Sequence, residues 1–578
     1  MAQRPAVPPA RAGGLLCVTT LGIRVREGWA RANRAGVGKP SAARRAKARV
    51  PRASEGHDGL SERPARWHGP APSFVGRDRG LGDIDYHRRL DIDACKEPRV
   101  QPPTNHDRDR WENPLAARYA SAEMTGLWSD TRRYSLWRKV WLALAESEAE
   151  LGLPITPAQL AEMRAHLETV DFGKAADYEK RMRHDVFAHL HAFADDCPAA
   201  RPIIHLGATS AFVTDNTDLV LIRESLDLIA ARLATVIERL AARALETREL
   251  VCLGRTHLQP AQPTTIGKRI CLWIHDLLLD LEEVSHRRKL LRARGVKGTT
   301  GTQASFLELF AGDHAKVRRL DELVATKLGF HSSYEVTGQT YTRKIDSQVV
   351  AALAGVSESC HKAGNDLRLA AAWGEMEEPF EKEQVGSSAM PYKRNPMRAE
   401  RMCGLGRFVM GMAVTAGQTA ATQWLERTLD DSAPRRLVLP QAFLATDAQL
   451  VLYANIAGGL VVLPGGVRKN LEAHLPFLAA EKILMAGTKA GGDRQALHEA
   501  LRAHSHAATA RIREGEANDL ADRLAADPLF AAVDLAAALA PDDLAGRSAE
   551  QVEEFVAGAV QTALSDCPAR APEAALKV

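Results

Sequence analysis

A short run of chemically versatile residues lies in the second half of the chain, at residues 386–396. Gly386 begins it, the hydroxyls of Ser387 and Ser388 follow, and Lys393 stands between two prolines. Glycine lets a backbone approach a ligand, paired hydroxyls offer a base with a neighbouring donor, and a lysine can neutralise developing negative charge. The run therefore predicts a catalytic loop. The alternative, a solvated turn between helices, explains the glycine and the prolines but not the clustered hydroxyls and cations.

A second candidate for chemistry is His257, in the polar, proline-punctuated run at residues 256–265. Imidazole exchanges protons near neutral pH, so this side chain could serve as a general acid. A lone histidine more often has a structural role, and the residue type leaves both interpretations open. An apolar stretch with helical spacing follows the run, so the histidine would lie just before a long helix.

Three further histidines, His184, His189 and His191, raise the question of a metal site. Their sequence intervals of five and two residues place His184 off the helix face that His189 would share. No acidic ligand pattern completes a site. We therefore predict that no metal ion is bound here.

Residues 427–436 are the best candidate for recognising a phosphate group. Phosphate binding needs bidentate donors and backbone amides, and this turn-rich segment supplies three arginines and a serine. A helix-capping, salt-bridged connection is the alternative. Pro434 could alter how Arg435 and Arg436 are presented, because its ring fixes the local backbone. The glycine-rich stretch 295–302 could also cradle phosphate through its amides, but it lacks the ending of a nucleotide-hydrolase loop and does not indicate ATP binding.

The whole chain has the composition of a soluble protein with a sizeable core, with 578 residues, 45% of them hydrophobic and 26% charged. Its formal net charge of +4 comes from residues 1–50, and the remainder is mildly acidic, so we expect no nucleic acid partner. Eight scattered cysteines without a Cys-x-x-Cys pair indicate reduced thiols in a cytoplasmic protein. No window approaches the roughly 18 uninterrupted apolar residues of a membrane span, so we expect no membrane partner.

Long helices must position these residues. Apolar side chains recur at steps of three and four over residues 219–240, and Asp215 and Asp218 just before them suit the positive end of a helix dipole. Similar patterns are found at residues 270–284, 344–373, 397–426 and 437–461. Five long helices predict an all-α fold around a bundle. Because several are apolar on more than one face, we also expect self-association.

Breaks in this pattern predict four regions. Residues 1–110 are rich in Arg, Pro and Gly without sustained periodicity, which predicts a disordered extension. An organelle transit peptide and a translated upstream stretch are the alternatives for this extension. We predict an N-terminal helical domain at 111–210, a central long-helix bundle carrying the catalytic loop at 211–463, and a C-terminal helical domain at 464–578.

The pattern Gly-Ser-Ser-x-Met-Pro-x-Lys-x-Asn-Pro at residues 386–396 resembles the signature loop of the fumarase, aspartase and argininosuccinate lyase superfamily, whose members release fumarate. Its form at residues 389–396 is similar to the adenylosuccinate lyase branch, in particular to animal-type sequences. The likeness extends from about Asn113 to near Val560. It implies a fold of three helical domains, in which the central helices of four chains form the core of a homotetramer.

The resemblance implies roles for the candidate residues. Ser387 is the base, with Lys393 stabilising the anion that forms. His257 matches the histidine of a Thr-His-x-Gln-Pro-Ala-Gln motif that protonates the leaving group, and His184 is a further catalytic candidate. The implied substrate contacts are Arg118, Tyr119, Arg183, His184, Asp185, Thr209, Ser210, Gln339, Arg401, Arg427, Ser432 and Arg436.

These roles fit the elimination of an amine from a succinyl group, which needs a base, an acid for the departing nitrogen and cations for the intermediate dianion. The implied substrates are adenylosuccinate, which gives AMP and fumarate, and SAICAR, which gives AICAR. The resemblance also implies active sites shared between chains and no metal or organic cofactor. Argininosuccinate lyase is disfavoured because its substrate carries no phosphate for residues 427–436. A silent structural protein, such as a lens crystallin of this superfamily, is disfavoured by the intact Ser387, His257 and Lys393.

Overall fold

The computed structural model describes residues 111–541 and 544–576. The predicted disordered extension at residues 1–110 lies outside the described residues. The helices and strands considered below all belong to one unit of the chain, Gln101–Val578. The domain boundaries drawn near residues 210 and 463 stay predictions.

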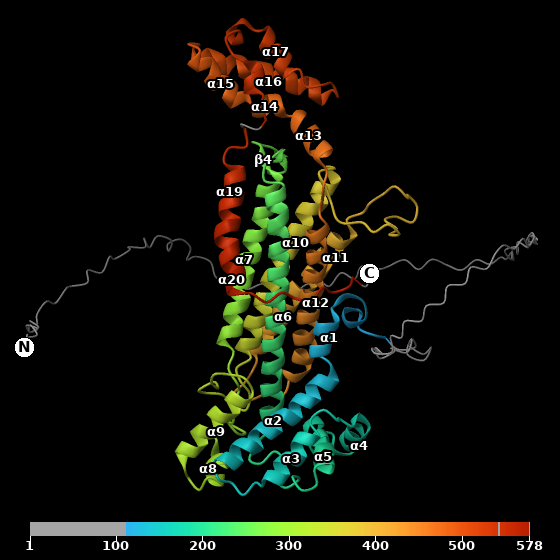
Figure 1. The fold of residues 1–578 in the computed structure, drawn as a ribbon, viewed down its shortest axis with the longest axis vertical. Helices are drawn as coiled ribbons and strands as arrows, with labels where there is room; N and C mark the ends of the chain where they lie inside the picture. Colours follow the sequence, from blue (N-terminus) through green and yellow to red (C-terminus); the bar gives the residue numbers. More distant parts are fainter. Residues whose placement is uncertain (1–110, 542–543, 577–578) are drawn as a thin grey trace, which may run out of the picture. The chain divides into compact units, whose positions relative to one another are not determined.

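Five long helices lie side by side and form the centre of this unit (Figure 1). They are α6 (Ser210–Glu246), α7 (Ile266–Leu290), α10 (Lys344–Ala372), α11 (Met397–Ala421) and α12 (Ser432–Gly459). Helix α10 packs against α7, α11 and α12, while α6 packs against α7 and α12. The predicted all-α fold with a long-helix bundle is confirmed.

Apolar spacing explains why these segments are helical and which faces they bury. In α6, Leu219, Ile222 and Leu226 lie one helical turn apart and are all inaccessible to solvent. Helix α12 is apolar and long enough to cross a membrane by length and composition, but most of it is buried within the unit. It is therefore the core helix of the bundle, whose neighbours supply the apolar surroundings that its sequence demands.

Short helices precede the bundle, and polar caps fix where they begin. Ser129 accepts a hydrogen bond from the Arg132 amide at the start of α2, and Thr156 forms a reciprocal capping box with Gln159 at the start of α3. The elements of this region are η2, a π-helix (Leu115–Tyr119), α1 (Ala122–Leu127), α2 (Asp130–Glu150), α3 (Pro157–Ala165), α4 (Phe172–Met182) and α5 (Asp185–Asp196).

Two further helices, α8 (Ala304–Leu309) and α9 (His314–Lys327), lie between α7 and α10 in the chain. The region that follows α12 has a hydrophobic core of its own, built from residues between Ala479 and Ala538. Helix α19 returns to pack against α7. The helices of this region are α13 (Pro464–Glu472), α14 (Leu475–Leu478), α15 (Ala480–Lys489), α16 (Arg494–Arg513), α17 (Leu520–Ala526), η3 (Pro528–Phe530), α18 (Leu535–Ala538), α19 (Ser548–Phe555), η5 (Val556–Val560) and α20 (Gln561–Asp566).

The described strands are two residues long and form antiparallel pairs that close turns between helices. Two pairs are nested in the connection between α6 and α7, and the third joins the ends of α10 and α12. The pairs are β1 (Val251–Cys252) with β4 (Thr264–Thr265), β2 (Arg255–Thr256) with β3 (Gln259–Pro260), and β5 (Met376–Glu377) with β6 (Val461–Val462).

Candidate active site

A polar cavity of about 780 Å³, the first cavity, lies where the beginnings of α5, α6 and α12 meet. Seven of the predicted substrate contacts line it. They are Arg183, His184, Asp185, Ser210, Arg427, Ser432 and Arg436. Arginines from two segments more than two hundred residues apart in sequence thus converge on one cavity, which is the arrangement that an anionic ligand needs.

The turn before α5 presents three of these residues. Arg183 ends α4 in the left-handed region, with φ 56, which turns the chain sharply. His184 then caps α5, and its Nδ1 accepts a hydrogen bond from the Phe187 amide at 3.3 Å. Because Nδ1 accepts, the neutral ring carries its proton on Nε2, where it can donate to a ligand.

Asp185 joins the two sides of the first cavity. Its Oδ1 accepts a hydrogen bond from the Val186 amide at 2.8 Å, and its Oδ2 accepts one from the guanidinium of Arg436. Burial would raise the pKa of the Asp185 carboxyl, but the hydrogen bond and the charge of Arg436 outweigh burial and hold the pKa below its ordinary value. Asp185 is therefore ionised and paired across the cavity.

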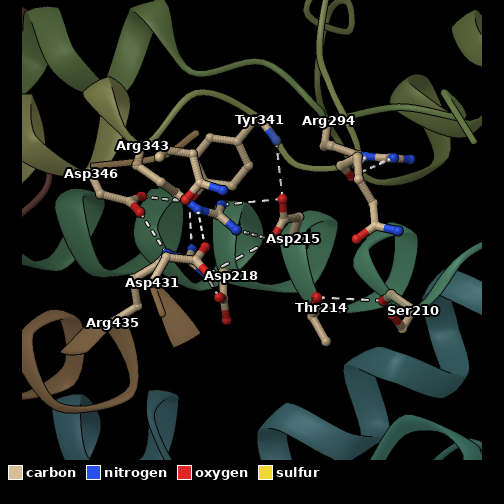
Figure 2. A network of polar contacts seen from close by, with 12 residues as sticks. Ser210, Thr214, Asp215, Asp218, Arg294, Tyr341, Arg343, Asp346, Asp431 and Arg435 are labelled. Carbon is tan, nitrogen blue, oxygen red and sulfur yellow. Dashed lines mark hydrogen bonds and ion pairs between the residues drawn. The ribbon is translucent and has the colours of Figure 1, made fainter. Parts of the chain in front are cut away.

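A buried ion-pair network forms one wall of the first cavity (Figure 2). Both terminal nitrogens of Arg343 donate to Asp215 of α6, at 3.0 and 3.2 Å, and Nε donates to Asp431 at 2.7 Å. Burial would raise the pKa of the Asp215 carboxyl, yet the charges of Arg343 and Arg435 hold it below its ordinary value. The remaining members of the network are Asp218, Tyr341 and Asp346.

Arg435 ties the first turn of α12 to this network. Its Nε donates to Asp346 at 2.7 Å, and its Nη2 donates to the Tyr341 hydroxyl at 2.8 Å and lies 3.1 Å from an Asp218 oxygen. Pro434 stands in that same first turn, where the helix has no hydrogen bond for a proline to remove. Arg435 thus points into the buried network, and Arg436 lines the first cavity. Pro434 fits in the first turn of α12 without disturbing either arginine.

A second cavity, of about 580 Å³, shares Arg427 with the first. Gln339 lines it; the Gln339 amide donates to the Glu426 carbonyl at 3.0 Å, and its side chain donates to the Thr209 hydroxyl at 3.3 Å. The predicted contacts Gln339 and Thr209 are therefore held together beside the segment that carries Arg427.

The glycine-rich stretch 295–302 packs against the protein at both ends. A Cβ on Gly295 would lie 2.2 Å from Asp321 Oδ1, and one on Gly301 would lie 1.9 Å from the Thr337 carbonyl. The Val296 amide donates to Asp321 at 2.6 Å. These glycines thus permit close packing at the two ends of the stretch, whereas Thr299 and Thr300 between them line the second cavity. The phosphate cradle stays a prediction.

The signature loop, residues 386–396, has a narrow neck. A Cβ on Gly386 would lie 2.2 Å from the Lys393 carbonyl, so only glycine fits, and the Asn395 side chain donates to the Gly386 carbonyl at 2.8 Å. Ser387 is half-buried, and its Oγ accepts from the Met390 amide at 3.2 Å. Lys393 is exposed at the surface. Ser387 and Lys393 thus lie on a loop whose two ends are in close contact.

His257 lies at the exposed tip of the β2–β3 hairpin. Both residues of the tight turn have positive φ, 53 for His257 and 61 for Leu258, which matches the two-residue turns that join antiparallel strands. The residue is exposed, so it is accessible to groups outside its own chain.

The predicted contacts Arg118, Tyr119 and Arg401 form a further group. The guanidinium of Arg401 lies 5.8 Å from the centre of the Tyr119 ring, within the range of a cation–π contact. Helix η2, which carries Arg118 and Tyr119, packs against α12. This group adjoins the bundle through α11 and α12.

Within one chain the candidate residues do not meet in one place. Helix α6 has 37 residues and is therefore about 55 Å long, with Ser210 in the first cavity at its beginning and the β2–β3 hairpin beyond its end. The elements α5 and β4 accordingly lie at opposite ends of α6 (Figure 1). Among the residues that the structure describes, His257, Ser387 and Lys393 do not line either the first or the second cavity.

Comparison with known proteins decides the family. A family model described as lyase matches residues 132–411, and one described as adenylosuccinate lyase C-terminus matches residues 476–555. The adenylosuccinate lyase of Schistosoma mansoni is 50% identical over 467 residues, which cover 79% of this chain and 97% of the relative. That of Saccharomyces cerevisiae is 51% identical over 464 residues, 79% of this chain and 96% of the relative. The chain belongs to the adenylosuccinate lyase family.

Solved structures agree on the fold of this adenylosuccinate lyase family member. A 3-carboxy-cis,cis-muconate lactonizing enzyme from Pseudomonas putida superimposes with a TM-score of 0.70 at 25% identity, covering 78% of this chain and all of that one. The family assignment made from the signature loop is thus confirmed, and with it the long-helix bundle.

The histidines considered for a metal site have other surroundings in this family member. His189 stacks on Tyr134 with ring centres 3.7 Å apart, and burial lowers the pKa of its imidazole to about 4. Among the described residues, no group of three or more His, Cys, Asp or Glu side chains is arranged to hold a metal ion.

Sequence reasoning missed the residues that build the wall of the first cavity, above all Arg343. Asp215 and Asp218 were interpreted as partners of a helix dipole, whereas the structure pairs them with guanidinium groups inside the protein. One signal was available. Carboxylates within an otherwise apolar helical pattern are rarely buried without partners, so two of them in α6 point to buried cations elsewhere in the chain.

Proposed function

We propose that this member of the adenylosuccinate lyase family eliminates fumarate from adenylosuccinate to give AMP, and from SAICAR to give AICAR, in purine nucleotide biosynthesis. The main support for this proposal is the first cavity, in which arginines from two segments lie beside the polar residues at the beginnings of α5 and α6. Both substrates carry a nucleoside phosphate and a succinate that is attached through a nitrogen. Identity of about half to curated adenylosuccinate lyases supports the same assignment.

In this proposal Arg427, Ser432 and Arg436 hold the phosphate. Arg436 is largely exposed to the first cavity, and Arg427 lines both cavities. Guanidinium groups match the oxygens of a phosphate in pairs, and the beginning of α12 adds the positive end of a helix dipole. His184 donates from Nε2 to the substrate, and Arg183, Ser210 and Thr209 supply further donors.

The bond-breaking step is assigned to residues outside the first cavity. Ser387, as its alkoxide, removes the proton from the substrate carbon beside a carboxylate. Lys393 and nearby amides stabilise the resulting dianion, and His257 gives a proton to the nitrogen as the C–N bond breaks, so that fumarate and the amine leave. General acid and base contributions are each worth about two to four powers of ten in rate.

A shared active site reconciles this chemistry with the geometry. The hairpin of His257 lies about 55 Å from the first cavity along α6, so one chain does not unite them. Exposed apolar side chains on the bundle, Leu272 and Leu279 of α7 and Phe408 and Val414 of α11, favour burial against other copies of the chain. We infer a homotetramer in which different chains contribute the base, the acid and the phosphate site.

The cytoplasm is the proposed compartment. Each cysteine that the structure describes has a free thiol, and five of these six are buried. Free buried thiols are typical of proteins that stay in a reducing environment. The mildly acidic remainder of the chain beyond residues 1–50 gives no general footprint for nucleic acid.

An absorbance assay of the purified full chain tests the reaction. With adenylosuccinate or SAICAR, fumarate and the corresponding amine should form in equal amounts. With argininosuccinate there should be no turnover, since that substrate brings no phosphate to the first cavity. Fumarate from argininosuccinate alone, or from none of the three, would refute the assignment.

A further inference from the structure

The ion pair between Asp185 and Arg436 spans the first cavity and joins α5 to α12. The side chain of Asp185 is 21% exposed and that of Arg436 is 62% exposed, so both partners remain accessible from the cavity. Asp185 is held in place on its other side by the Val186 amide at the beginning of α5. The cation is therefore the partner that is free to move.

The neighbouring arginines differ from Arg436 in their ion pairs and in their exposure. Arg435 has carboxylates or hydroxyls of several residues around it and is 10% exposed, and Arg343 is 1% exposed with both of its carboxylate partners buried. Arg133, which also lines the cavity, pairs with Asp218 and is 20% exposed. Among these paired cations of the first cavity, Arg436 is the most exposed.

A carboxylate and a phosphate compete for the same guanidinium, because both present two oxygens to its paired N–H groups. An ionised carboxylate beside a bound phosphate also repels it. In the structure, Asp185 Oδ2 accepts a hydrogen bond from one terminal nitrogen of Arg436, while Asp185 Oδ1 accepts from the Val186 amide. A phosphate that takes both paired N–H groups of Arg436 must therefore displace Asp185 from that nitrogen.

We propose that Asp185 is a positioning residue that holds Arg436 in the free enzyme and yields it to the phosphate group of the substrate. The inference rests on the proposed function, and it replaces the direct substrate contact expected for Asp185 from the sequence. The exchange makes the site more selective for phosphate over weaker anions. A monoanion gains too little from Arg436 to displace the carboxylate, whereas a phosphate dianion displaces it.

Calorimetric titration of the full chain with AMP tests the exchange. Asp185→Asn keeps an oxygen for the Val186 amide but removes the competing charge, so the Kd for AMP should fall about threefold to fivefold. A residue that only contacted substrate or only stabilised the fold would give the opposite sign when replaced. Should this variant fail to fold, Asp185→Ser, which also keeps an acceptor at the helix start, carries the same test.

The matched control is Glu179→Gln. Glu179 is an exposed acid that lines the same cavity, whereas the ion-pair partner of Arg436 is Asp185. Its replacement removes the same charge and should change the Kd for AMP by less than about twofold. Equal tightening in both variants would overturn the exchange in favour of a general charge effect.

Two further variants separate this proposal from the function on which it rests. Arg436→Gln should weaken AMP binding by about tenfold or more, and in that background Asp185→Asn should tighten it less than in the parent chain, because only the repulsion between carboxylate and phosphate is left to relieve. If Arg436→Gln weakens binding but Asp185→Asn also weakens it or leaves it unchanged, the exchange is wrong and the phosphate site stands. If Arg436→Gln leaves the Kd unchanged, both assignments fall.

Discussion

Arg435 and Arg436 are adjacent in sequence and have opposite surroundings. Successive residues of a helix point about 100° apart, so one side chain of α12 enters the bundle while the next reaches the first cavity. Arg435 is buried among acids and Arg436 lies at the surface beside Asp185. One arginine thus fixes the helix that presents the other.

At the residue scale, Ser387→Ala and His257→Gln should each lower the turnover number for adenylosuccinate by about two to four powers of ten. Both positions are accessible in the chain and neither supports the core, so folding and assembly should be unchanged. Steady-state kinetics with size-exclusion chromatography of each variant measures both quantities. Near-normal turnover in both variants would remove the assigned base and acid.

The buried network gives a stability prediction of the same scale. Arg343→Met leaves the carboxylates of Asp215 and Asp431 without their partner inside the protein, so the free energy of unfolding should fall by about 3–5 kcal/mol. Urea denaturation measures the loss. Arg319→Met is the control, because Arg319 pairs with Glu322 on the surface and its removal should change little. A similar effect of both variants would contradict the network's role.

These residues also show how far a sequence can be interpreted. The hydroxyls and the lysine of the signature loop can be chosen as candidates from the sequence because their types and spacing are local. The partner of Asp215 was not, since Arg343 is 128 residues away and no periodicity links the two. The same limit applies to His257, because we propose that its surroundings come from other chains and no local pattern indicates them.

At the scale of elements, the apolar pattern predicted all five long helices. The seam at residues 219–240 lies inside α6, which extends to Ser210–Glu246. The underestimate has a physical cause, because the first turns of α6 contain the polar residues that build the cavity wall and break the apolar pattern. The two-residue strands were missed, since pairs this short carry no period of their own.

Helix α2 carries an acid whose surroundings predict a pH dependence. Glu148 is fully buried with neither oxygen hydrogen-bonded to a described group, and burial raises its pKa to about 9. The unfolded chain releases this proton near pH 4.5, whereas the folded chain keeps it. Stability contributed by this group is therefore lost progressively as the pH rises from about 4.5 to about 9.

Glu148→Gln should remove that loss. The variant should be within about 1 kcal/mol of the parent in unfolding free energy at pH 5 and more stable by roughly 4–5 kcal/mol at pH 8. Urea denaturation at both pH values measures the difference. Glu150→Gln is the matched control on the same helix, because Glu150 is an exposed partner of Lys327. A pH-independent effect of Glu148→Gln would contradict the assigned protonation.

At the scale of the whole molecule, the cavities of the described chain do not unite the candidate residues. Its first cavity gathers the phosphate-binding candidates, while the signature loop and the β2–β3 hairpin present their reactive groups to the surface. Apolar side chains are left exposed on α7 and α11, and in the proposed homotetramer these faces pack against further copies. Assembly and catalysis are therefore expected to depend on each other.

Activity of mixed oligomers tests this account most directly. Ser387→Ala and His257→Gln chains, each inactive alone, are unfolded together in equal amounts, refolded and assayed with adenylosuccinate. If different chains supply the base and the acid, random mixing restores both groups in about one quarter of the sites, and activity should recover toward that fraction of the parent enzyme. Mixed oligomers that form but stay as inactive as the separate variants would contradict the shared site.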